Sequence, residues 1–147
     1  MKISSERHSA REYAIRLLYC DDLLNQAEIK PLPVAPNWWK NDDRLSVRKQ
    51  TDQFARELLD GVRNKRSQID EIIREHAQHW RLERISIVDR NILRLGLYEL
   101  QNYPETPTKV VLNECLELGK CYGDEDSVRF LNGILDSAAR ALRGDEA

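Results

Sequence analysis

The chain has 147 residues, enough for one domain with a core of its own. A charged fraction of 33% and a hydrophobic fraction of 41% are typical of a folded soluble protein and exclude a disordered tail. The net charge of -2 excludes a protein that is basic overall, so a nucleic-acid surface would have to be a local patch.

The start of the chain has no long apolar run, and Glu6 and Arg7 lie within it, so it does not resemble a signal peptide. The cysteines, Cys20, Cys115 and Cys121, are odd in number and follow no metal-ligand spacing. Free thiols indicate a reducing compartment. We therefore expect a cytoplasmic protein without a membrane span.

The first predicted helix covers residues 9–25, after a basic arm formed by residues 1–8. Ser9 and Glu12 have the spacing of a capping box, which places the start of the helix there. Arg11 and Arg16 are expected to project away from its apolar stripe. That stripe consists of Ala10, Ala14, Leu17, Leu18 and Leu24.

Residues 30–48 are the least regular part of the chain. Pro31, Pro33 and Pro36 exclude a helix over their own stretch. The Trp38-Trp39 pair that follows fits either a surface loop held by two indoles or a short helix entered near residue 37. Both interpretations stay open.

Residues 52–80 have a helical period throughout, but one internal signal divides them. Ser67 and Asp70 have the spacing of a second capping box. This predicts two consecutive helices, 52–65 and 68–79, with a break at residues 66–67.

Residues 86–100 are predicted to form the central helix. Apolar side chains cover nearly its whole circumference, a pattern typical of a buried helix. Ser86 and Asp89 form a capping box at its start. The stretch is too short and too charged to span a bilayer.

Two more helices complete the predicted fold. Thr106 and Pro107 read as an N-cap followed by proline in the first turn, and Gly123 ends that helix. Asp124 is expected to cap the last helix, which ends at Gly144. Because no alternating strand pattern occurs, the predicted class is all-α, a single domain over residues 1–147 with six or seven helices.

No catalytic motif stands out. The GxGxxG, P-loop, GxSxG and HExxH patterns are absent, so we do not expect an enzyme. His76 and His79 could share one helical face, but nothing nearby supplies a third ligand, and we expect no metal or cofactor. Cys115 and Cys121 are better explained as small core residues than as a redox pair.

The basic residues near the start are more informative. Cations at a helix N-terminus can neutralise phosphates, although a solvated helix end would look the same. The residues concerned are Lys2, Arg7, His8, Arg11 and Arg16. In the last helix, Phe130 falls off the apolar stripe beside Arg129. It could stack on an unpaired base or lie in a groove between helices.

Four segments resemble the NusB family of transcription antitermination factors. Residues 7–19 resemble the arginine-rich opening helix of that family. The other three resemble its C-terminal half and read VDRNILRLGLYEL, PTKVVLNECLELGKCYG and SVRFLNGILD. The resemblance covers most of residues 7–22 and 52–142, in the right order and spacing, and does not include residues 30–48.

The resemblance implies an all-helical fold of two small helical bundles packed together, and a role in binding rather than catalysis. It implies pairing with NusE, a ribosomal protein of the small subunit. The heterodimer would bind the boxA element of nascent RNA and join an antitermination complex on RNA polymerase, promoting read-through in ribosomal RNA operons.

The resemblance also implies roles for individual residues. His8 and Ser9 replace arginines that are common in the family, so Lys2 would gain importance. The implied RNA-binding residues are Lys2, Arg7, Arg11, Lys109, Ser127, Arg129 and Phe130. Those implied to contact protein partners are Tyr19 and Asp89, which would face NusE, and Asp126, which would face the antitermination complex.

Two other functions stay open. NusB-like modules also occur in ribosomal RNA cytosine methyltransferases, although no downstream catalytic domain is seen here. A helical adaptor that binds only proteins is the second alternative, because the arginine arm is depleted. Some family members self-associate, so a homodimer is a further alternative.

Overall fold

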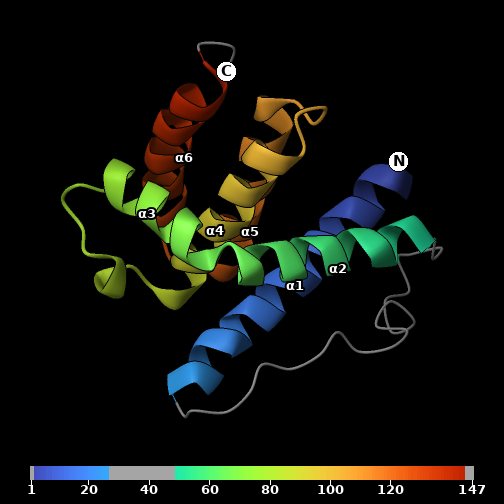
Figure 1. Ribbon diagram of the computed structural model, residues 1–147, viewed down its shortest axis with the longest axis horizontal. Helices are drawn as coiled ribbons and strands as arrows, with labels where there is room; N and C mark the ends of the chain where they lie inside the picture. The colour runs from blue at the N-terminus through green and yellow to red at the C-terminus, as the bar shows by residue number, and fades with distance from the viewer. Residues whose placement is uncertain (1, 27–48, 145–147) are drawn as a thin grey trace. The chain divides into compact units, whose positions relative to one another are not determined.

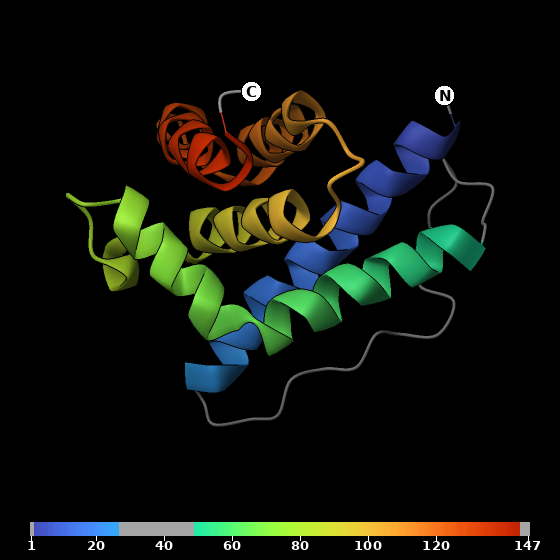
Figure 2. The ribbon, with the colours of Figure 1, turned by 45° about the horizontal axis from the view of Figure 1, so that its top comes forward.

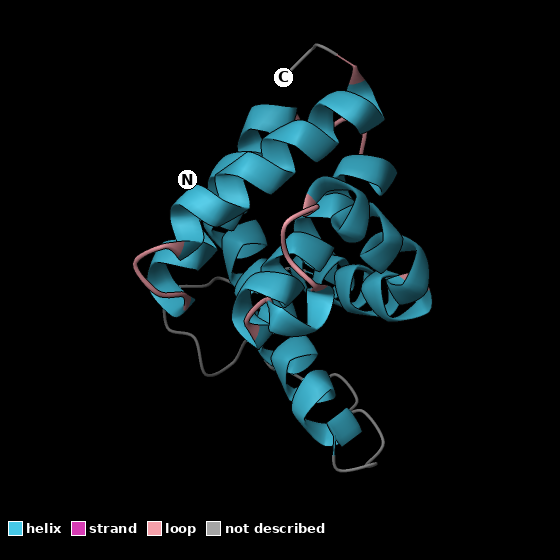
Figure 3. Cartoon of the chain, turned by 90° about the vertical axis from the view of Figure 1, so that its left-hand side faces the viewer, coloured by secondary structure: helices cyan, strands magenta, loops and turns pink. Residues whose placement is uncertain are grey.

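The computed structural model describes residues 2–26 and 49–144, with side chains for residues 7–25 and 52–144. Within this part the chain contains helices and loops and no strand (Figure 3). The chain divides into two compact units, Met1–Gly61 and Val62–Ala147, and each is described by itself. The predicted all-α class is confirmed.

Six α-helices and one 3-10 turn make up the described part (Figure 1). The seventh helix that the sequence left open, near residue 37, lies outside the described residues. The bounds are α1 Lys2–Gln26, α2 Lys49–Asn64, α3 Arg66–His76, η2 Leu82–Arg84, α4 Ile87–Asn102, α5 Thr108–Tyr122 and α6 Ser127–Arg143.

Helix α4 is the centre of the second unit, as predicted. It packs against α5 and α6, which also pack against each other (Figure 2). Every residue from position 91 to position 97 is buried. The Ser86 hydroxyl accepts a hydrogen bond from the Asp89 amide at 3.1 Å, so the predicted cap is present. Burial on all sides follows from the apolar circumference.

The buried polar residues of α4 have partners. The Arg94 guanidinium donates to both carboxylate oxygens of Asp70 on α3, at 2.7 and 3.0 Å. It also donates to the Asn91 side chain at 3.1 Å. Because a buried charge is tolerated when it is paired, this contact joins α3 to α4 inside the core.

Helices α4, α5 and α6 meet at Gly96. A Cβ atom placed there would lie 2.7 Å from the Cys115 sulfur and 3.1 Å from Leu135. Cys115 is therefore a core residue, as predicted. The same prediction is wrong for Cys121, which is exposed at the end of α5.

Several predicted helix boundaries are shifted. Helix α1 begins at Lys2, so Ser9 lies inside it and residues 2–8 are not a separate arm. The break between α2 and α3 falls at Lys65, and Ser67 lies inside α3 rather than at its cap. In both cases no proline or glycine lies directly before the capping pattern. Because no helix-breaking residue is present, the helix continues through the pattern instead of starting at it.

The starts of the last two helices differ by one or two residues from the prediction, whereas their ends at Gly123 and Gly144 are as predicted. Pro107, rather than Thr106, is the N-cap of α5. Asp126, rather than Asp124, is the N-cap of α6. Gly144 ends α6 with a φ of 78°, a conformation that favours glycine.

The last residue of α6 holds the loop between α4 and α5. The Arg143 guanidinium donates hydrogen bonds to the carbonyl oxygens of Leu100, Tyr103 and Thr106, at 3.0, 2.9 and 2.7 Å. It also donates to the Thr108 hydroxyl at 3.1 Å. These contacts satisfy carbonyls at the C-terminal end of α4 and place the first turn of α5.

Candidate nucleic-acid and partner surfaces

In the first unit, two predicted RNA-binding arginines share one aromatic ring. The Arg7 guanidinium carbon lies 4.4 Å from the centre of the Phe54 ring on α2, and that of Arg11 lies 5.4 Å from it. The Arg7 side chain is half-buried, whereas Arg11 is only 2% exposed. The prediction that Arg11 projects away from the core is therefore wrong.

The remaining cations of α1 are placed differently. His8 lies 3.7 Å from the Glu12 carboxylate one turn later, so Glu12 offsets its charge when His8 is protonated. Arg16 is exposed. The side chain of Lys2 lies outside the described residues. On this helix, Arg7 and Arg16 are therefore the described arginines that solvent reaches.

Tyr19 is exposed on the same helix, as its predicted partner role requires. Its side chain is 37% exposed, and that of Leu23, one turn later, is 42% exposed. Two large side chains with apolar surface four residues apart form a small exposed stripe. The sequence analysis did not predict that Leu23 is exposed. The available signal was its position four residues after Tyr19, which places both side chains on one face of the helix.

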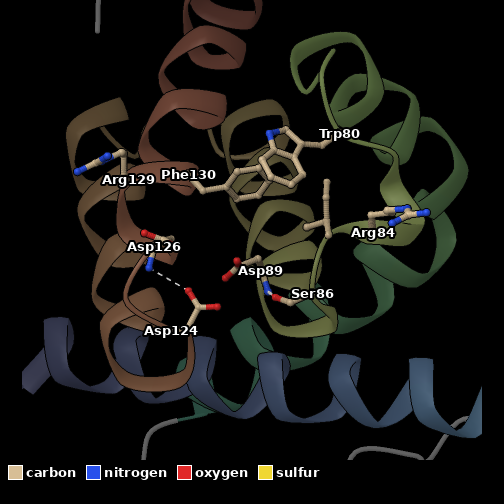
Figure 4. Close-up of a pocket in the computed structure, with 9 residues that line it drawn as sticks. Trp80, Arg84, Ser86, Asp89, Asp124, Asp126, Arg129 and Phe130 are labelled. Atoms are coloured by element: carbon tan, nitrogen blue, oxygen red, sulfur yellow. Dashed lines mark hydrogen bonds between the residues drawn. The ribbon is translucent and has the colours of Figure 1, made fainter.

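In the second unit, a pocket of about 480 Å³ opens beside the start of α6. Trp80 and Phe130 form one side of it, and a group of aspartates forms the other (Figure 4). The two rings meet edge to face, with centroids 5.9 Å apart. The pocket is lined by Trp80, Arg84, Ile85, Ser86, Asp89, Asp124, Asp126, Arg129 and Phe130.

Asp89 lies in the inner part of this pocket and is only 7% exposed. Its Oδ1 atom is buried and has no hydrogen-bond partner within the described part of the chain. Burial raises the pKa of Asp89 above its ordinary value; a hydrogen bond from Ser127 opposes this, and the nearby Asp124 carboxylate adds to it. A partner reaching Asp89 must therefore enter the pocket, because this carboxylate is not on an open surface.

The pocket brings together four of the predicted site residues. Asp126 and Arg129 are exposed at its mouth, and Phe130 is half-buried in its wall. Asp89 joins them from α4. Sequence reasoning missed Trp80, because nothing in the residues after α3 indicates that its indole meets the ring of Phe130 on α6.

Ser127 and Lys109 lie in different settings. Ser127 is 1% exposed, and its hydroxyl accepts a hydrogen bond from the Asp124 amide at 2.9 Å. A Cβ atom at Gly123 would collide with this hydroxyl, so Gly123 provides the space that the turn requires. Ser127 thus shapes the turn before α6. Lys109 is exposed in the first turn of α5 and does not line the pocket.

The described residues contain no group of three side chains suited to a metal ion. The ring of His76 contacts the Ser137 hydroxyl at 2.8 Å, and His79 is exposed. Within the same residues, no helix is long and apolar enough to cross a membrane.

Comparison with known proteins identifies the family. The sequence model of the NusB family matches residues 8–140, which is most of the chain. The chain belongs to the NusB family. The resemblance drawn from the sequence is thereby confirmed, and with it a family whose members bind RNA rather than catalyse a reaction.

Curated relatives within the NusB family are similar over nearly their whole length. The transcription antitermination protein NusB of Myxococcus xanthus is 41% identical over 136 residues, which is 92% of this chain and 96% of that protein. The NusB protein of Bacillus cereus is 40% identical over 137 residues, which is 93% of this chain and 99% of that protein. Both relatives are named transcription antitermination proteins, so the comparison favours this role over the methyltransferase module.

Solved NusB structures have the same fold. NusB of T. maritima is 31% identical with a TM-score of 0.75, covering 91% of this chain and 90% of that one. The matched chain in a structure of the antitermination factors NusB and NusE in complex with dsRNA is 27% identical, with a TM-score of 0.69. The match covers 93% of this chain and 98% of that chain.

Proposed function

We propose that this protein is a cytoplasmic transcription antitermination factor that binds boxA RNA as a heterodimer with NusE. Family membership supports the antitermination role. The NusB structure solved with NusE and RNA supports the two partners. The observation in this chain that carries the proposal is the Trp80–Phe130 ring pair beside the exposed Arg129, because RNA-binding proteins recognise unpaired bases by stacking them on aromatic rings.

The RNA contacts divide by chemistry. Arg7, Lys109 and Arg129 are cations that solvent reaches and would contact phosphates, together with Lys2. Phe130 would stack on a base. Arg11 and Ser127 are too buried for direct contact in this conformation; they would support the RNA surface through the residues around them.

The contacts with NusE use two surfaces. Tyr19, exposed on α1, offers an aromatic ring of the kind enriched at interface hot spots. Asp89 offers an unpartnered oxygen inside an acidic pocket, which suits a cationic side chain of a basic ribosomal protein. Asp126, exposed at the pocket mouth, would face the antitermination complex on RNA polymerase.

Size-exclusion chromatography with NusE and a boxA oligonucleotide tests the proposal. We expect one ternary peak and weaker RNA binding by the chain alone, because part of the RNA surface would belong to NusE. A NusE complex that binds boxA no better than a scrambled oligonucleotide would favour the protein-only adaptor. Light scattering on the chain alone would show whether it forms a homodimer.

A further inference from the structure

Arg7 and Arg11 on α1 share the Phe54 ring on α2. Arg7 and Arg11 are one turn apart on α1, so their like charges repel each other. The Phe54 ring on α2 contacts both guanidinium groups, at 4.4 and 5.4 Å, and is itself only 4% exposed. A ring face attracts cations, and this attraction is stronger where water is excluded.

The contact with Phe54 leaves donors of the Arg7 guanidinium for an anion. A guanidinium has five N–H donors, and one ring beside its central carbon does not occupy all of them. A flexible arginine normally loses side-chain freedom when it binds, and prior ordering removes part of that loss. The ring contact and the partial burial of Arg7 therefore restrict its side chain before an anion arrives.

We propose that Phe54 is a positioning residue for RNA binding. Its ring orients Arg7 so that the N–H edge of the guanidinium meets an RNA phosphate, and Arg11 completes the stack from the buried side. This inference rests on the proposed RNA-binding function. It adds a residue of α2 that contacts no RNA and acts only through Arg7.

The test is a double-mutant cycle with Phe54→Leu, Arg7→Ala and the double variant, measured as boxA affinity of the NusE complex. We expect Phe54→Leu to weaken binding about threefold to tenfold, as the loss of a partly desolvated cation–π contact predicts. We expect no further loss when Phe54→Leu is added to Arg7→Ala. A fluorinated phenylalanine at position 54, which keeps the shape and weakens the ring's attraction for cations, should reproduce the effect of Phe54→Leu.

Matched variants separate positioning from folding. Phe54→Tyr keeps the ring and should keep the affinity. Leu59→Val trims another buried side chain of α2 and should lower stability without changing boxA affinity. Circular dichroism would confirm that each variant is folded.

The possible failures can be distinguished. If Phe54→Leu weakens binding equally with and without Arg7, or if the fluorinated ring binds like the native one, the positioning role is overturned while RNA binding stands. If Arg7→Ala itself leaves boxA affinity unchanged, the proposed phosphate contact fails, and the inference fails with it.

Discussion

Trp80 and Phe130 meet edge to face at an interplanar angle of 82°, although one follows α3 and the other belongs to the first turns of α6. Trp80 is 57% exposed, so the pair is open to solvent on one side. The contact holds Phe130 in place while leaving aromatic surface for a base. This geometry leads to the first prediction.

Phe130→Leu should weaken boxA binding by the NusE complex by about 1–3 kcal/mol, the usual loss for one stacked base. Phe130→Tyr should bind nearly as well as the native protein. Fluorescence anisotropy with labelled RNA gives both affinities. Arg140→Gln, which removes an exposed charge near the other end of α6, serves as the control, and an equal loss in that variant would contradict the stacking role.

Arg7 and Arg11 should behave differently when each is replaced by alanine. Arg7→Ala should reduce the slope of log affinity against log salt by about 0.7, the value for one phosphate contact on a single strand. Arg11→Ala should instead destabilise the fold by about 1–3 kcal/mol, because its partners inside the protein lose a buried group. Salt titrations and urea unfolding separate the two. Equal salt slopes for Arg7→Ala and the native protein would refute this assignment.

Asp89→Asn should make the protein more stable at neutral pH. The folded-state pKa of Asp89 is raised, so the folded protein binds more protons than the unfolded chain between the ordinary value of 3.8 and the raised value. The free energy of unfolding therefore falls as the pH rises through that window. The asparagine side chain does not ionise, so the variant does not lose this stability. Thermal unfolding of both proteins over a pH series checks the sign. A stability difference that grows below the ordinary value would show that another group is responsible.

Asp89→Lys should abolish pairing with NusE, because a cation would then occupy the pocket proposed for a basic side chain. Burial of the new charge also lowers stability, so Asp89→Asn provides the folded comparison. Co-elution with NusE is the measurement. Normal co-elution of a folded Asp89→Lys protein would place the NusE contact elsewhere.

Arg143→Ala should destabilise the second unit by about 1–3 kcal/mol, since three carbonyl oxygens lose a charged donor. The matched control is Arg140→Ala, whose exposed pair with Asp136 at 3.4 Å should contribute little. Urea unfolding compares the two. Comparable losses would mean that Arg143 does not hold the loop.

The sequence predicted best the features that depend on one segment. Burial of α4 follows from its own apolar circumference, and the Ser86 cap from residues three apart. The start of α1 was missed because a capping pattern is not a boundary when the residues before it also favour a helix. Local rules were therefore reliable for the type of element and less so for its ends.

The candidate site is formed by contacts between helices that are far apart in the sequence, and these contacts cannot be predicted from local patterns. The burial of Arg11 involves a ring contributed by α2, and the pocket exists because α4, α6 and the residues after α3 converge. The family resemblance implied that Asp89 contacts NusE and that Phe130 contacts RNA, without relating the two residues in space. Their presence in one pocket required the tertiary structure.

The close approach of three helices at Gly96 limits what chemistry the molecule tolerates. The Cys115 sulfur occupies the room that a single added carbon would need. An oxygen atom gained by that sulfur would be crowded by α4 on the side that faces Gly96. Cys115 is buried and Cys121 is exposed, so oxidants would reach Cys121 first, and oxidation of Cys115 would require the core to open.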